Sequence, residues 1–258
     1  MGIDFHSKEN QQSYTTRNVH SIWSETIQSL VPFDHVSTAL DVGCGGGIYS
    51  KALSDMGVDS IIGVDFSHAM LEGAKENCKG YPRISFTHGH AFDTGVEGES
   101  IDLLLERALI HHLQDLSSCF KEGHRVLKEE GCYIIQDRTP EDCLVEGSDQ
   151  HIRGYFFKLF PRLIEKETSR RHTSQTVIHH LKAAGFKEIE ERKLWEIRKV
   201  YNHKNQLLQD LKERVGRSIL HELDDKEIQH LIQFIDRALP SEGQIVEKDR
   251  WTIWRAVK

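Results

Sequence analysis

A glycine-rich segment is the first place in this sequence where residue types and spacing indicate chemistry. The segment LDVGCGGG places Gly43, Gly45 and Gly47 directly after an apolar run, with Asp41 two residues before the first glycine. Glycines let a chain turn tightly at the N-terminus of a helix and bring backbone amide groups against a ligand. On its own, this spacing also fits a nicotinamide or flavin site.

Two carboxylates narrow the choice of ligand. Asp65 stands about 20 residues beyond the glycines, at the end of a second apolar run, where a carboxylate accepts hydrogen bonds from both hydroxyls of a ribose. A carboxylate at Asp41 would lie beneath the turn, where it would repel a pyrophosphate and help to hold a cationic amino group. The pattern therefore predicts a ligand that has a ribose and an ammonium group but no diphosphate.

The elements that must position these residues alternate between strand and helix. Short apolar runs predict buried strands at residues 38–42, 60–65, 83–88, 101–106 and 132–137. Apolar residues at helical spacing, with a cap or a glycine stop, predict helices at residues 48–57, 67–78, 115–127 and 173–185. A further strand is expected from residue 186, and RWTIWRAV predicts a final one. This alternation predicts an α/β fold, a doubly wound and mostly parallel sheet with ligands at the carboxyl ends of its strands.

Two stretches depart from the alternation, residues 140–172 and 197–247. The first contains the aromatic run RGYFFKLF, and the second contains helical patterns at residues 207–223 and 228–235. In a single domain of residues 1–258, insertions after the late strands lie near the ligand end of the sheet. We therefore expect both stretches to form a helical cap, with helices packed on the back of the sheet as the alternative.

The composition argues against several classes of protein. The net charge of −7, with acidic and basic residues interleaved, argues against a nucleic-acid surface. The apolar runs stay below membrane-spanning length, and the N-terminus has neither a basic region nor an apolar core. Five cysteines at scattered spacings predict reduced thiols in a cytoplasm. The 16 histidines lack the spacing that specifies a metal site, so we expect no metal.

Four motifs between residues 38 and 139 carry a family resemblance: DVGCGGG, GVDFS, FDTGVEGESIDLLLERALIHHL and LKEEGCYIIQDRT. In this order and spacing the sequence resembles the class I S-adenosylmethionine-dependent methyltransferases, in particular the small-molecule branch with the ubiquinone/menaquinone-type and trans-aconitate-type enzymes. Beyond residue 140 the resemblance rests mainly on the helix ending AAGF and on the closing strand. It implies a Rossmann-like sheet of seven strands, the last antiparallel, and S-adenosyl-L-methionine as cofactor, with S-adenosyl-L-homocysteine as its product.

The resemblance also implies roles for single residues at the methionine end of the cofactor. The residues implied to lie there are Asp41, Gly43, Gly45 and Arg107, the last through its backbone. Near the N-terminus, YTTR resembles an element that folds over the cofactor. Its Tyr14 would cover the cofactor, and its Arg17 would face the cofactor's carboxylate.

At the other end of the cofactor, the resemblance implies that Asp65 binds the ribose hydroxyls and that Phe66 packs on the adenine. The family often has an Asp-Ala pair at the adenine amine, where this chain has His90 and Ala91. The acidic contact is therefore missing there, and we expect His90 or the nearby Asp93 to replace it.

The sequence indicates less about the site of the methyl acceptor. Methyl transfer from a sulfonium needs alignment and exclusion of water rather than a nucleophilic side chain. A hydroxyl or amine acceptor would gain from a general base, and His111 in ALIHHL stands where it would face the transferred methyl, with loop packing as the alternative. Candidate acceptor contacts are His112, Arg138, Tyr155, Arg214 and Arg217. The alternatives are packing in the cap core for Tyr155 and a solvated helix face for the last two arginines.

The sequence thus predicts a cytoplasmic methyltransferase that acts on a small molecule, with neither nucleic acid nor a membrane as partner. A nicotinamide-dependent oxidoreductase and a cofactor-binding module without transferase activity are the alternatives. The acceptor and the oligomeric state do not follow from the sequence, because acceptor pockets are built from variable insertions rather than from shared motifs.

Overall fold

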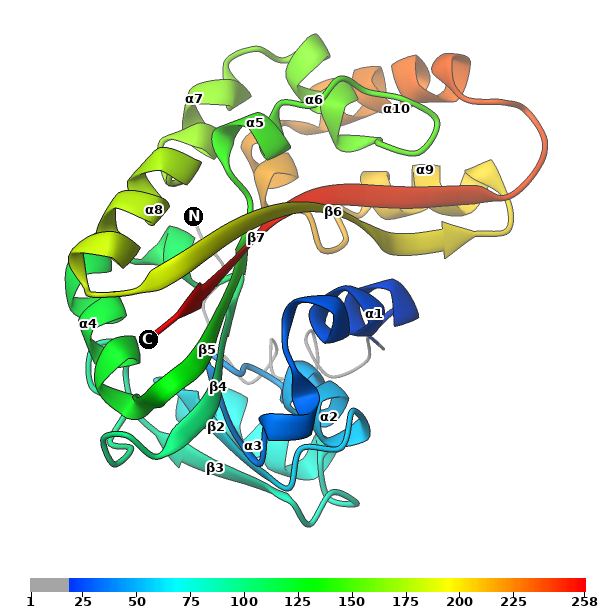
Figure 1. The fold of residues 1–258 in the computed structure, drawn as a ribbon. Coiled ribbons are helices and arrows are strands. Elements are labelled where there is room, and N and C mark those ends of the chain that lie inside the picture. The colour runs from blue at the N-terminus through cyan, green and yellow to red at the C-terminus, as the bar shows by residue number, and fades with distance from the viewer. Residues whose placement is uncertain (1–18) are drawn as a thin grey trace. The chain divides into compact units, whose positions relative to one another are not determined.

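The computed structural model describes residues 19–258, and Figure 1 shows how their helices and strands are arranged. The chain forms two compact units. We call the first the sheet unit; its described residues are 19–137, 172–194 and 252–258. We call the second the helical unit; its described residues are 138–171 and 195–251.

A seven-stranded sheet has the order β3-β2-β1-β4-β5-β7-β6. Its strands are β1 Thr38–Val42, β2 Ser60–Asp65, β3 Ile84–His88, β4 Ile101–Arg107, β5 Leu127–Asp137, β6 Lys187–Tyr201 and β7 Ile245–Val257. The strands β1 to β5 pair in parallel, and β7 pairs with β5 in the antiparallel direction. The predicted α/β fold with an antiparallel last strand is therefore confirmed.

The strand order reverses between β1 and β4, where ligands bind in open α/β sheets. Val42 of β1 lies beside Glu106 of β4, so these two strands end at the same edge of the sheet. Val64 of β2 lies on the other side of Val42, which places the end of β2 at this edge as well. The residues that follow these three strands are therefore brought together.

Helices cover both faces of the sheet in the sheet unit (Figure 1). They are α1 Ser21–Leu30, α2 Ile48–Asp55, α3 His68–Asn77, α4 Leu116–Val126 and α8 Ser174–Ala183. Ala39 packs in one core cluster with Trp23 of α1, whereas Leu40 packs in another with Phe120 of α4 and Val177 of α8. Successive side chains of a strand point to opposite faces, so β1 is buried on both sides.

The predicted helix ends are mostly confirmed. Ser67 caps α3 by accepting a hydrogen bond from the amide of Met70, and Asp115 caps α4 through the amide of Ser118. Leu127, which the apolar spacing placed in α4, is instead the first residue of β5. It pairs with the start of β4 in the sheet, and this pairing outweighs the helical pattern.

The helical unit has its own core. Its helices are α5 Pro140–Cys143, α6 Arg153–Leu159, α7 Leu163–Thr168, α9 Lys204–Lys212 and α10 Asp225–Ala238, with a 3₁₀ helix at Ser218–Glu222. Phe156, Leu211 and Leu231 are fully buried in this core. Asp224 and Glu227 form a complete capping box at the start of α10. That this unit is a cap over the ligand end of the sheet stays a prediction.

The expected helix over residues 207–223 is wrong in its second half. α9 ends at Lys212, and the chain then passes through positive φ at Arg214 (56°) and Gly216 (60°), a conformation that a helix does not contain. Val215 is consequently 43% exposed, although Ile219 still reaches the core from the 3₁₀ helix. The apolar period predicted burial correctly for Ile219 but not the continuity of the helix.

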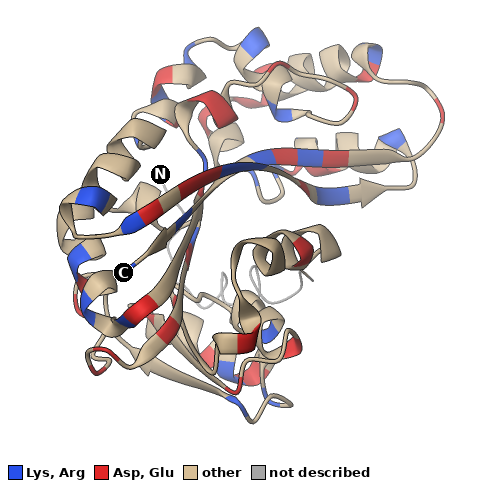
Figure 2. Cartoon of the chain, in the orientation of Figure 1, with Lys and Arg blue, Asp and Glu red and all other residues tan. Residues whose placement is uncertain are grey.

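Figure 2 shows acidic and basic residues interspersed along the chain, most visibly on β6 and β7. In β7 the run EKDR at residues 247–250 alternates in charge.

Within residues 19–258, no helix is both long enough and apolar enough to cross a membrane. All five cysteines are buried and free.

Candidate functional site

The glycine turn joins β1 to α2 and is held by hydrogen bonds inside the protein. Gly43, Gly45 and Gly47 have φ angles of 73°, 52° and 74°, which residues with a side chain rarely adopt. The amides of Gly43 and Cys44 donate to the carbonyl of Val64 at 2.8 and 3.0 Å. The amide of Gly47 donates to the carbonyl of Cys44 at 2.9 Å. The turn is thus fastened to the end of β2.

Asp65, the last residue of β2, fixes the same turn. Its Oδ2 accepts a hydrogen bond from the amide of Gly45, and its Oδ1 accepts one from the amide of Ser67, both at 2.9 Å. Each carboxylate oxygen has two lone pairs, so both can also accept from a ribose hydroxyl. The amides of Gly43, Gly45 and Gly47 all donate within the protein, and the contact of these glycines with a ligand stays a prediction.

Asp41 lies beneath the turn and is only 2% exposed. Its Oδ2 accepts a hydrogen bond from the hydroxyl of Ser50 at 2.6 Å. Burial raises the pKa of Asp41 to about 6; Asp65 also raises it, whereas Ser50 and Arg107 lower it. A cationic partner would favour the charged form of such a carboxyl, so this position suits a ligand ammonium group.

Flat rings gather beside the end of β2. Phe66 is 40% exposed, and the ring of His90 lies stacked at 6.0 Å from it, with an angle of 25° between the planes. His90 and Asp93 pair through their backbones, and Ala91 packs against the core between them. The structure thus brings together the residues expected at the adenine. Exposed ring faces suit the stacking of an adenine base.

The end of β4 approaches the glycine turn closely. A Cβ atom at Gly43 would lie only 3.0 Å from a methyl group of Leu109, so a larger residue there would require the Leu109 side chain to shift. The guanidinium of Arg107 lies 4.2 Å from the ring centre of Tyr49 in α2. This cation–π contact links the end of β4 to the helix that follows the turn.

His111 forms a pair with Asp137, the last residue of β5. Nδ1 of His111 lies 2.8 and 3.0 Å from the two carboxylate oxygens, and its backbone amide donates to Oδ2 at 3.2 Å. The Asp137 side chain is 2% exposed and that of His111 is 11% exposed. A carboxylate accepts hydrogen bonds, so in the neutral ring the proton stays on Nδ1 and Nε2 is the basic nitrogen.

Asp137 is a candidate functional residue that the sequence reasoning missed. The only signal was an acidic residue at the end of a predicted strand, 26 positions from His111. The two meet because β4 and β5 are neighbours in the sheet. His112 is exposed, and its ring lies 4.0 Å from that of His111.

The remaining acceptor candidates lie in the helical unit, and their contact with an acceptor stays a prediction. Tyr155 is buried, 5.8 Å from the ring of Phe234, within the core of this unit. Arg214 and Arg217 are not on a helix face, because α9 ends before them. Arg214 donates to the carbonyls of Leu220 and Leu223, in and just after the 3₁₀ helix, and Arg217 is 3% exposed. Arg138 lies 3.9 Å from a carboxylate oxygen of Asp249.

Two further expectations concern other parts of the site. Tyr14 and Arg17 lie outside the described residues. From residue 19 onward, the structure contains no cluster of histidine, cysteine, aspartate and glutamate side chains that would hold a metal ion.

Comparison with known proteins identifies the part of the chain that carries the glycine turn. Residues 40–135 match a family model described as a methyltransferase domain. This part of the chain is therefore similar to a methyltransferase domain. Demethylmenaquinone methyltransferase from Staphylococcus epidermidis is 32% identical over 122 residues, which is 46% of this chain and 51% of that protein. The matched part thus spans about half the length of this curated relative.

Solved structures extend the likeness in fold beyond the methyltransferase domain. A putative methyltransferase from an antibiotic biosynthesis pathway of Anabaena variabilis has a TM-score of 0.70 and 18% identity, covering 93% of this chain and 98% of that one. Phosphoethanolamine N-methyltransferase 2 of Haemonchus contortus, in complex with S-adenosyl-L-methionine, has a TM-score of 0.59 and 19% identity. The structural match covers 100% of this chain and 60% of the Haemonchus contortus chain. At these identities the likeness establishes the fold alone.

Proposed function

We propose that this protein is an S-adenosylmethionine-dependent methyltransferase that acts on a small molecule. The observation that carries the proposal is the placement of Asp41 and Asp65 on one glycine turn within a methyltransferase domain. Both side chains are hydrogen-bond acceptors, and the ligand must therefore bring donors to this turn. An ammonium group and a pair of ribose hydroxyls meet this requirement.

The residues around the turn fit the rest of this cofactor. Asp41 would hold the ammonium group, Asp65 the ribose hydroxyls, and the rings of Phe66 and His90 the adenine. The roles of Gly43, Gly45, Arg107, Ala91 and Asp93 in cofactor binding belong to the same proposal. When bound, the cofactor supplies a methyl group activated by a sulfonium. The complex of the Haemonchus contortus enzyme with S-adenosyl-L-methionine supports this assignment.

We further propose that His111 is the general base for a hydroxyl or amine acceptor. Nε2 would take the acceptor's proton as the acceptor atom bonds to the methyl carbon and the carbon–sulfur electron pair stays on sulfur. Asp137 would hold the ring in the required tautomer and stabilise its charged form. A positioned base of this kind contributes typically about 10²- to 10⁴-fold in rate.

The acceptor is proposed to be a small molecule. The name of the Staphylococcus epidermidis relative agrees with a small-molecule acceptor. A cytoplasmic location is proposed as well, supported by five free cysteines. A nicotinamide cofactor is disfavoured because the amides of Gly43, Gly45 and Gly47 donate within the protein and the side chains beside the turn are carboxylates.

Calorimetric titration with S-adenosylhomocysteine tests the proposal, with NADH as a parallel ligand. We expect micromolar binding of the first and no binding of the second. Binding of NADH alone would move the protein to the oxidoreductases, and binding of neither ligand would overturn the cofactor assignment. If S-adenosylhomocysteine binds, a screen of small acceptors with labelled methyl donor distinguishes an enzyme from a cofactor-binding module.

A further inference from the structure

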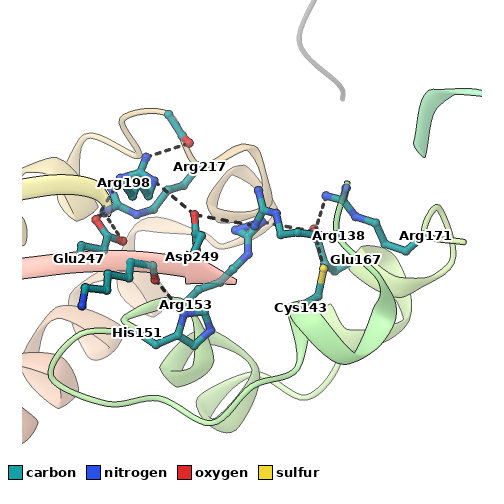
Figure 3. Close-up of polar contacts among 12 residues, drawn as sticks. Arg138, Cys143, His151, Arg153, Glu167, Arg171, Arg198, Arg217, Glu247 and Asp249 are labelled. Atoms are coloured by element: carbon teal, nitrogen blue, oxygen red, sulfur yellow. Dashed lines mark hydrogen bonds and ion pairs between the residues drawn. The ribbon is translucent and has the colours of Figure 1, made fainter. Parts of the chain in front are cut away.

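A buried group of arginines lies in the helical unit (Figure 3). We call it the arginine cluster. Its arginines are Arg138, Arg153, Arg171, Arg198 and Arg217, and its carboxylates are Glu167, Glu247 and Asp249.

Glu167 is fully buried at one end of the cluster and is shared by several cations. Its Oε1 lies 2.8 Å from Arg171 and 3.3 Å from Arg153, and its Oε2 lies 2.6 Å from the more exposed Arg170. Burial would raise the pKa of Glu167, but Arg153, Arg171 and Arg170 hold it well below its usual range. This carboxylate is therefore ionised and forms ion pairs with three guanidinium groups.

Glu247 occupies the other end and is also shared. One nitrogen of Arg217 lies 2.9 and 2.7 Å from its two oxygens, and Arg198 lies 3.0 Å from Oε2. Asp249 lies between the two ends, 3.9 Å from both Arg138 and Arg198, which exceeds hydrogen-bond distance. Figure 3 shows Arg138 and Arg153 between the carboxylates of Asp249 and Glu167.

The centre of the arginine cluster is buried. The Arg138 side chain is 14% exposed and that of Arg153 is 10% exposed. Burial lowers the pKa of Arg138, and Arg153 and Arg171 lower it further, whereas Asp249 acts in the opposite direction. Buried cations are costly unless anions pair with them, so Arg153, whose partner Glu167 is shared with other guanidinium groups, favours an additional anion.

Two buried atoms at this place are not satisfied by the described residues. Nε of Arg153 is a donor that has no hydrogen-bond partner among them. Nε2 of His151 also has no partner among them. Nδ1 of His151 lies 3.0 Å from the carbonyl of Lys248, so Nδ1 carries the proton. Burial lowers the pKa of His151, so the ring is neutral and Nε2 is an acceptor. The cluster thus offers an unused donor and an unused acceptor.

We propose that the arginine cluster binds an oxyanion of the methyl acceptor, a carboxylate or a phosphate group. Guanidinium groups pair with both through two parallel hydrogen bonds. Nε2 of His151 would accept a hydrogen bond from a hydroxyl of the same ligand. This inference rests on the proposed function. Arg138 follows Asp137 directly in the chain, so the cluster begins one peptide bond away from the proposed base pair.

The test is thermal unfolding of the full chain with inorganic phosphate, with malonate and with sodium chloride at equal ionic strength. We expect one of the two oxyanions to raise the unfolding midpoint saturably above the chloride value, and its identity tells phosphate from carboxylate. Midpoints that follow ionic strength alone would overturn the proposal. Binding of S-adenosylhomocysteine is measured on the same sample, so failure of the cofactor assignment is seen separately.

Two variants locate the anion. Arg153→Gln should weaken anion binding by roughly 10-fold or more, because a charge-assisted pair is lost. The matched control is Arg162→Gln, an exposed arginine of the same unit that pairs with Glu227 at 2.7 Å and should leave anion binding unchanged. If Arg153→Gln does not fold, Arg138→Lys replaces it, since lysine keeps the charge but not the paired donors. Equal losses in a cluster variant and in the control would contradict the proposal.

Discussion

Replacing Glu106 with Gln tests whether one buried carboxyl makes the stability of this protein depend on pH. Glu106 lies in β4 and is 2% exposed. Its two oxygens lie 3.2 and 3.4 Å from Sγ of Cys119, and the hydroxyl of Tyr133 also hydrogen-bonds to the carboxyl. Burial raises its pKa to about 7, although these hydrogen bonds act in the opposite direction.

The sign and size of the effect follow from this pKa. The folded state holds the proton of Glu106 more tightly than the unfolded state, in which the pKa has its ordinary value of 4.5. The stabilisation is therefore complete below pH 4.5, declines as the pH rises and is lost above pH 7. One pKa unit corresponds to about 1.4 kcal/mol, so the loss is on the order of 3 kcal/mol.

Urea unfolding followed by tryptophan fluorescence, at pH 5 and at pH 8, measures this loss. The wild-type protein should lose about 2–3 kcal/mol more stability between these pH values than Glu106→Gln, because the amide does not ionise. Glu129→Gln, an exposed substitution in β5, is the control and should behave as wild type. If the free energies of Glu106→Gln and wild type change in parallel with pH, the assignment of the buried charge to Glu106 is refuted.

Three further predictions concern the candidate site. Asp65→Ala should weaken S-adenosylhomocysteine binding by roughly 10-fold or more in calorimetry, because two charge-assisted hydrogen bonds to the ribose are lost; unchanged affinity would remove Asp65 from the site. Because the pKa of Asp41 is about 6, affinity should fall as the pH drops from 7.5 to 5, and Asp41→Asn should flatten this dependence. Asp137→Asn should lower kcat by about 100-fold or more while leaving S-adenosylhomocysteine affinity unchanged. Once an acceptor is known, the double variant of His111→Gln and Asp137→Asn should have a kcat little lower than that of either single variant. Losses of kcat that multiply would show that the two residues do not act together.

The parts of the fold that could be predicted depend on neighbouring residues in the chain. The glycine turn is visible because the positive φ angles at Gly43, Gly45 and Gly47 strongly favour glycine. Asp65 could be placed at the end of β2 because the apolar run before it is short and continuous. In both cases the local sequence carries the signal.

The parts that could not be predicted depend on contacts between distant residues. His111 and Asp137 meet only because β4 and β5 are adjacent, and Arg217 reaches Glu247 across 30 positions. A spacing pattern cannot show such a pair. The break after α9 was missed for a different reason. The apolar spacing continues through Val215, whereas the backbone has already left the helical conformation.

The hydrogen bonds of the glycine turn bear most directly on the choice between cofactor classes. A turn that binds a pyrophosphate uses backbone amides as its recognition groups, and the ligand must bring acceptors. In this protein the amides of Gly43 and Gly45 donate to Val64 and Asp65, and the side chains beside the turn are carboxylates. The ligand must therefore bring donors. Ribose hydroxyls occur in both cofactor classes, so the ammonium group that we propose at Asp41 is what would separate them, and the pH dependence of binding is the measurement that isolates it.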